Sequence, residues 1–197
     1  KGFVIADLKI NFDNKGNIKN NYFAKGYVKD AKLSLFKDHK LSDLNFVFKI
    51  EKDNLEIQDS EFMLDGINFF SDKIDLKRIK QGYSLNGNLN NNIVELNNKN
   101  FNLFREKFIP DIGVEKITFS SKNEFSFNLD ENFKISNKYI LSNIDVKKFL
   151  IANNFKLKNI FPKINDKILI ENNNLKIEYN KNNLYIGGKG DIYLQNN

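Results

Sequence analysis

The chain has 197 residues, a formal net charge of +6 and no cysteine. This length predicts one domain, or part of a larger one, with a real core, and the lack of cysteine excludes a disulfide framework and a thiolate metal site. With 19 phenylalanines and 41% hydrophobic residues, the chain is not disordered, because disordered chains lack the apolar side chains needed to collapse.

Lysine supplies nearly all of the positive charge. The sequence contains 29 lysines and 34 asparagines but two arginines, a bias that resembles a codon preference for A and T. The lysines are spread along nearly every predicted strand, without a block of like charges. Because proteins that read nucleic acid favour the bidentate guanidinium of arginine, we interpret the lysines as a solvated face and expect no nucleic-acid partner.

Alternation of apolar and polar residues, the pattern of a strand with one apolar face, begins near the first residue. The first row comprises Leu8, Ile10 and Phe12. The motif DNKGN at 13–17 then predicts a turn. A second row occupies 22–28, and a third occupies 31–35 with the opposite parity, which predicts a bulge or tight turn near Asp30.

The alternation continues in separate rows at 44–50, 55–57, 62–64, 67–69, 74–76 and 83–89. It returns after residue 120, and its rows there lie at 125–129, 133–135, 175–179 and 184–194. Counted separately, these rows give about fourteen predicted strands.

Two segments show the period of a helix instead. Near 100–108, Asn100 is the expected N-cap and Pro110 the expected stop, and near 145–153 the expected cap is Asp145. The apolar positions at helical spacing are Phe101, Phe104 and Phe108 in the first segment, and Val146, Phe149 and Leu150 in the second.

A single sheet of about fourteen strands would be on the order of 65 Å wide, which two short helices cannot cover. We therefore predict a mainly β fold: a long twisted antiparallel β-meander curled into an apolar groove, with two short helices. The candidate groove residues are Leu8, Ile10, Phe12, Leu44, Phe46, Phe48, Leu55, Ile57, Phe62, Leu64, Ile67, Phe69, Ile74, Leu76, Leu85 and Leu89. A closed sandwich also buries alternate residues, so both arrangements stay open.

The sequence shows no catalytic or metal-binding set. The only histidine, His39, lies in the polar segment KDHKLSD without a second histidine for a metal site or a relay. DNKGN lacks the later glutamate of a calcium loop, and YIGGKGD at 185–191 lacks the spacing and helix of a phosphate loop. Gly188 and Gly190 instead predict a bend or the close approach of a bulky group. We expect no enzyme activity, no cofactor and no metal.

Residues 54–92 contain the segment LEIQDSEFMLDGINFFSDKIDLKRIKQGYSLNGNLNN. It resembles the repeating strand pattern of AsmA-like proteins, the bacterial envelope group that includes TamB and YhdP. The segments KGFVIADLKINFDNKGNIKNNYFAKGYVKDAKLSL and IFPKINDKILIENNNLKIEYNKNNLYIGGKGDIYLQ are similar in style. The likeness covers most of the chain apart from the stretch near 100–115.

The resemblance implies that residues 1–197 are a single segment of a longer AsmA-like β-groove domain. It implies a periplasmic protein of a Gram-negative-type bacterium, anchored in the inner membrane. No apolar run here approaches the roughly 20 residues that cross a bilayer, so the anchor is expected outside this segment.

The function implied is transport of phospholipid between the inner and outer membranes, with the acyl chains in the groove and no catalytic residues. The alternative is a non-catalytic structural β-scaffold, such as an adhesin or an envelope spacer, with a closed core.

Overall fold

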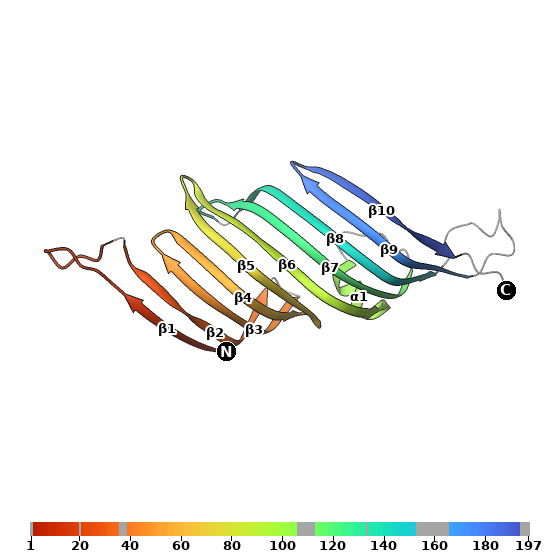
Figure 1. Ribbon diagram of the computed structural model, residues 1–197, viewed down its shortest axis with the longest axis horizontal. Coiled ribbons are helices and arrows are strands. Elements are labelled where there is room, and N and C mark those ends of the chain that lie inside the picture. The colour runs from red at the N-terminus through yellow and green to blue at the C-terminus, as the bar shows by residue number, and fades with distance from the viewer. Residues whose placement is uncertain are drawn as a thin grey trace. The chain divides into compact units, whose positions relative to one another are not determined.

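The computed structural model describes residues 2–19, 21–35, 39–105, 113–132, 134–152 and 166–193. This part of the chain forms an open sheet of ten strands that follow one another in chain order (Figure 1). The strands are β1 (Phe3–Lys9), β2 (Phe23–Leu35), β3 (His39–Glu51), β4 (Asn54–Leu64), β5 (Ile67–Ile79), β6 (Gly82–Asn97), β7 (Val114–Leu129), β8 (Ile135–Ala152), β9 (Lys167–Asn180) and β10 (Asn183–Tyr193). The predicted mainly β antiparallel meander is confirmed.

Tight turns join several neighbouring strands. Asp65 and Gly66, between β4 and β5, have φ angles of 50° and 90°. Lys181 and Asn182, between β9 and β10, have φ angles of 46° and 70°. Two successive positive φ angles are typical of the type I′ turn, whose twist matches that of the strands it joins.

The turn predicted at 13–17 is confirmed. The Asp13 carboxylate accepts hydrogen bonds from the Asn17 side chain (3.0 Å), from the Asn17 backbone N–H (2.9 Å) and from the Lys15 backbone N–H (2.8 Å). These bonds lower the pKa of Asp13 because they stabilise its ionised form.

The first predicted row is wrong in part. Leu8 lies in β1, but this strand ends at Lys9. Ile10 lies outside it, and Phe12 forms an isolated bridge with Ile18 across the following turn. The chain pairs with itself at this turn, so the three residues do not form one strand.

A line of bulges crosses β2, β3 and β4. The φ angles are 52° at Asp30, 55° at Asp43 and 48° at Asp59. The register of β2 with β3 shifts between Val28 and Ala31, so the bulge predicted near Asp30 is confirmed.

The bulges explain why about fourteen predicted strands correspond to ten in the described part of the chain. In β4, the apolar residues Leu55 and Ile57 have odd numbers, whereas Phe62 and Leu64 beyond Asp59 have even numbers. A bulged residue offsets the alternation by one position, which accounts for the change of parity. Rows that the sequence separates are therefore two halves of one strand.

The first predicted helix is confirmed as α1 (Asn98–Arg105), but its cap differs. The side chain of Asn97, rather than Asn100, accepts a hydrogen bond from a backbone N–H in the first turn, that of Asn100 (3.1 Å). Phe108 and Pro110 lie outside the described residues.

The second predicted helix, near 145–153, is wrong. Residues 145–152 belong to β8, and residue 153 lies outside the described part. Val146 and Ile151 are buried with 2% and 6% exposed. Asp145 and Lys147, two residues apart and so on one side of the strand, form an ion pair of 2.7 Å. Sheet pairing satisfies the backbone here, and β-branched residues fit a pleated surface better than a helix.

Glycines 188 and 190 lie in β10, where the predicted close approach is confirmed. A Cβ on Gly188 would lie 2.6 Å from Leu175 Cδ2, and one on Gly190 would lie 2.4 Å from Asn173 Cγ. Only glycine leaves room for these two side chains of β9.

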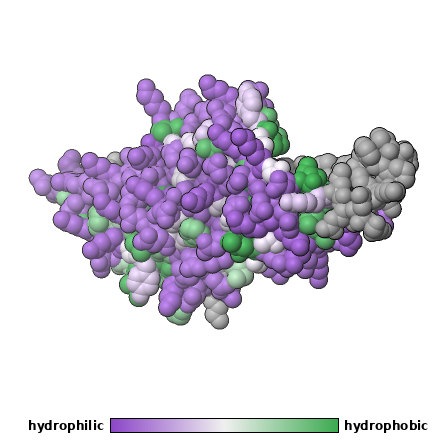
Figure 2. All heavy atoms as spheres, turned by 45° about the vertical axis from the view of Figure 1, so that its right-hand side comes forward, coloured by the Kyte–Doolittle hydropathy of each residue, from purple (hydrophilic) through white to green (hydrophobic). Residues whose placement is uncertain are grey.

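The chain divides into two compact units, each described by itself. The first comprises Lys1–Asn90, Asn123–Leu141 and Glu178–Leu184, and the second comprises Asn91–Lys122, Ser142–Ile177 and Tyr185–Asn197. The second unit holds a core of Val114, Ile151 and Ile168, against which Phe101 of α1 packs. Among the described residues of the first unit, the buried apolar side chains are Ala24, Leu41 and Ile67. Figure 2 shows a mostly hydrophilic surface with separate hydrophobic patches.

We predict that the left-handed backbone conformation at position 59 makes stability depend on which residue stands there. Side chains other than Asn and Asp rarely adopt a left-handed φ, so Asp59→Val should lower the free energy of unfolding by about 1–2 kcal/mol. Asp59→Asn and Asp59→Gly should change it by about 0.5 kcal/mol or less. Urea unfolding measures the effect. Glu61→Val, at an exposed position of the same strand with an ordinary φ, is the control. Equal losses for both valine variants would contradict the prediction.

Candidate functional site

The antiparallel register aligns apolar residues of six strands into rows across the sheet. Directly paired residues of an antiparallel sheet point to the same side, so each pair extends a row by one strand. From β1 to β6, the first row comprises Leu8, Ala24, Ile50, Leu55, Leu76 and Leu85. The second row comprises Ala6, Gly26, Phe48, Ile57, Ile74 and Gly87. A third, shorter row comprises Val4, Val28 and Phe46.

These three rows form one surface, which we call the apolar face. Neighbouring rows are two residues apart along every strand, so they lie on the same side of the sheet. Strands are spaced about 4.8 Å apart, and the two complete rows therefore extend about 24 Å from β1 to β6. They run across the strands, not along them.

Most side chains of the apolar face are only half-buried. Ala24 is buried with 8% exposed, whereas Leu8 on the edge strand is 63% exposed. Within the described residues of the first unit there is no helix and no second sheet to cover this face. Since full burial of a Leu, Ile or Phe side chain is worth about 1.5–3 kcal/mol relative to full exposure, a cover would be favourable.

The register brings together half of the predicted groove residues. Leu8, Phe48, Leu55, Ile57, Ile74, Leu76 and Leu85 lie in the two complete rows, and Phe46 lies in the third. Leu44 is paired with Ala31 next to the bulges. Ile10 and Phe12 lie outside the strands.

The remaining predicted residues lie beyond the bulges or near a register shift. Phe62 is paired with Phe69, and their rings stack with centroids 5.8 Å apart. Leu64 is paired with Ile67, which is 3% exposed. Leu89 lies in β6, where the pairing with β5 shifts.

The sequence prediction missed the small residues of the apolar face. Ala24, Gly26 and Gly87 occupy row positions between larger side chains. Small residues add little to a hydrophobic pattern. They do occupy the same alternate positions as the apolar residues of their strands, and this would have identified them.

A polar rim borders the first row. Arg78 is paired with Tyr83, and each lies two residues from a leucine of the first row, so both lie next to the apolar face on the same side of the sheet. A depression of about 160 Å³ lies here and is also lined by Tyr22, Lys52 and Asn54.

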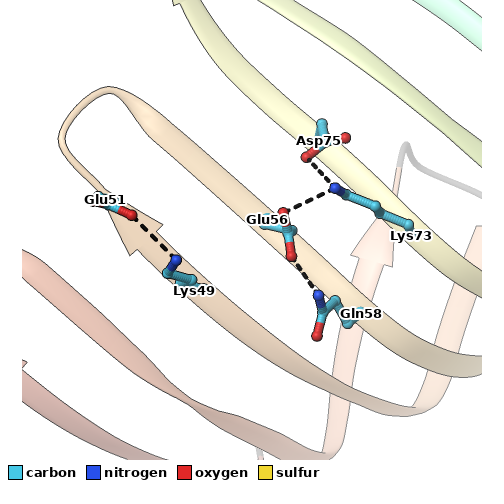
Figure 3. A network of polar contacts seen from close by, with 6 residues as sticks. All are labelled: Lys49, Glu51, Glu56, Gln58, Lys73 and Asp75. Carbon is cyan, nitrogen blue, oxygen red and sulfur yellow. Dashed lines mark hydrogen bonds and ion pairs between the residues drawn. The ribbon is translucent and has the colours of Figure 1, made fainter.

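The opposite face of the same strands carries an ion-pair network. Lys73 Nζ lies 2.9 Å from Glu56 Oε2 and 3.4 Å from Asp75 Oδ1, and Gln58 donates a hydrogen bond to Glu56 (Figure 3). The hydrogen bond from Lys73 lowers the pKa of Glu56, and the same bond raises the pKa of Lys73. A further shallow depression, of about 470 Å³, is lined mainly by polar residues that include Lys73 and Tyr139.

The described residues offer no group of three or more His, Cys, Asp or Glu side chains placed to hold a metal ion. His39 is the first residue of β3 and is paired with Leu35, while its side chain lies outside the described part. Among the described helices, none has the length and apolar character of a membrane span.

Comparisons of the chain with protein-family models, with curated proteins and with solved structures found no match. The resemblance to AsmA-like proteins therefore stays a prediction, and the function has to be argued from the site.

We predict that the network around Glu56 makes stability depend on pH in the acid range. The pKa of Glu56 is lowered on folding, so its contribution is present above the unfolded-state pKa near 4.5 and is lost as the pH falls through the folded-state pKa. Glu56→Gln should be less stable than the unsubstituted protein at pH 7, and the difference should shrink at lower pH. Urea unfolding from pH 7 to pH 2.5 measures it. Glu131→Gln, at an exposed turn position, is the control. A constant difference for Glu56→Gln at every pH would contradict the prediction.

Proposed function

We propose that the apolar face binds the acyl chains of phospholipids and carries them across the strands of the sheet. One observation carries the proposal: two apolar rows continue without interruption over β1 to β6, and no element of the described first unit covers them. An uncovered apolar surface of this kind marks a binding surface.

The direction and length of the rows suit an acyl chain. The hydrocarbon core of a bilayer is about 30 Å thick, so the chains of one leaflet extend about 15 Å. The complete rows extend about 24 Å, which is more than one such chain needs. A chain lying on the rows gains about 0.8 kcal/mol per buried CH₂ group without any positioned polar partner. It can therefore shift along the rows without breaking hydrogen bonds.

The resemblance to AsmA-like proteins supports the cellular part of the proposal. In this role the chain belongs to a longer periplasmic protein anchored in the inner membrane of a Gram-negative-type bacterium. The apolar face would carry phospholipid between the inner and outer membranes. The role requires no covalent chemistry, and we propose that the chain is not an enzyme.

Photo-crosslinking in cells tests the occupant of the apolar face. A photoreactive residue at Phe48, Ile57 or Leu76 should form adducts with phospholipid. The same residue at Lys49 or Lys77, which neighbour these positions on the opposite face, should form none. Mass spectrometry of the purified adducts measures the result. If the apolar positions form adducts with protein and none with phospholipid, the result would favour the structural scaffold.

We predict that a charge on the apolar face prevents acyl binding. A carboxylate there would have to lose water when a chain covers it, at a cost of several kcal/mol. Ile57→Asp should therefore lower the capture of a fluorescent acyl-labelled phospholipid by at least about tenfold, since about 1.4 kcal/mol corresponds to a factor of ten. Gln58→Asp, one residue away on the opposite face, is the control. Circular dichroism checks that both variants keep their strand content. Equal capture by both variants would contradict the prediction.

A further inference from the structure

The rim of the apolar face combines apolar and anion-binding groups in one place. Arg78 and Tyr83 are paired across β5 and β6, directly beyond the pair Leu76 and Leu85. Residues two apart in a strand lie on the same side of the sheet. On this side, leucine is therefore followed by arginine in β5 and by tyrosine in β6. A ligand that spans this boundary has an apolar part and a polar part.

The depression at this boundary has the size of a small polar group. Its volume is about 160 Å³, roughly five times the share of one water molecule in the liquid. Its polar lining comprises Tyr22, Lys52, Asp53, Asn54, Arg78 and Tyr83. Its apolar lining is the middle of the first row, at Ile50, Leu55 and Leu76. The depression therefore lies beside the first row, where a lipid whose acyl chain starts at Leu76 and lies on the row can place its polar group.

The charges in the depression favour an anion. Lys52 and Arg78 are cations, and Asp53 is the carboxylate among the lining residues. Arg78 Nη1 lies 3.9 Å from Asp53 Oδ1, which is too long for a hydrogen bond, and the two side chains are 64% and 69% exposed. A pair this long and this exposed contributes little, so the guanidinium can turn its donors toward a ligand.

Arginine is the side chain best suited to phosphate here. Its planar guanidinium donates two parallel hydrogen bonds to one phosphate, whereas the ammonium of lysine acts as a point charge. The chain contains two arginines against 29 lysines, and one of the two stands at this rim.

We infer that this rim is a headgroup site for a phospholipid whose acyl chain lies on the apolar face. The phosphate accepts hydrogen bonds from Arg78 and from the Tyr83 hydroxyl, next to the charge of Lys52. The inference rests on the proposed function, because it assigns the polar end of the same ligand.

Two lipids that differ only in the phosphate test the site. Fluorescent phosphatidic acid and diacylglycerol with the same labelled acyl chains are offered in phosphatidylcholine vesicles, and the lipid bound to the full chain is measured after separation from the vesicles. The unsubstituted protein should bind phosphatidic acid about tenfold more tightly than diacylglycerol, because hydrogen bonds to a charged group are stronger than those between neutral groups.

Arg78→Gln should reduce this preference to about threefold or less and leave diacylglycerol binding unchanged. Arg78→Lys should keep part of the preference, because lysine keeps the positive charge but cannot donate the two parallel hydrogen bonds of the guanidinium. Lys77→Gln is the matched control, since it removes the same charge one residue away on the opposite face. Circular dichroism again checks that the variants are folded.

The outcomes separate the two proposals. Equal binding of both lipids by the unsubstituted protein, or a preference that Arg78→Gln does not change, would overturn the headgroup site and leave acyl binding intact. Binding of neither lipid would overturn the proposed function. Displacement of phosphatidic acid by millimolar inorganic phosphate at constant ionic strength would show that the site takes free phosphate, and would overturn its assignment to a lipid.

Discussion

The apolar face depends on one constraint, that paired residues of antiparallel strands point to the same side of the sheet. A shift of one residue between any two strands would move every apolar side chain of one strand to the polar face. The bulges at Asp30, Asp43 and Asp59 offset the alternation at a similar level of three adjacent strands. Because the offsets in neighbouring strands compensate each other, the register of β3 with β4 is the same at both ends of the pair.

A single layer of strands derives its stability from different sources than a packed domain does. In the described first unit the apolar side chains contact one another across strands, and few of them are buried. The opposite face adds ion pairs such as that of Lys73 with Glu56, whose carboxylate pKa is lowered by the contact. Surface ion pairs of this kind contribute modestly. The apolar face is thus the surface that would gain most from a cover, which is why we propose an acyl chain as its occupant.

In the proposed headgroup site, the polar rim and the apolar rows would bind the two ends of one amphipathic ligand. Apolar contact fixes neither the position nor the direction of a chain, because burial free energy depends on area alone. A phosphate held at Arg78 would fix one end. It would set the direction of the lipid on the face, and release of this end would then be the step that allows the lipid to move on.

The local features of the fold are determined by the sequence itself. Alternation identifies the strands and their apolar residues, DNKGN identifies a turn, and the change of parity near Asp30 identifies a bulge, because each depends on residues close together in the chain. Tertiary structure decided the rest. Residues 145–152 have apolar side chains at helical spacing, yet they pair as a strand because the sheet satisfies their backbone. The placement of Arg78 beside Tyr83 depends on pairing between strands, and no local period carries that information.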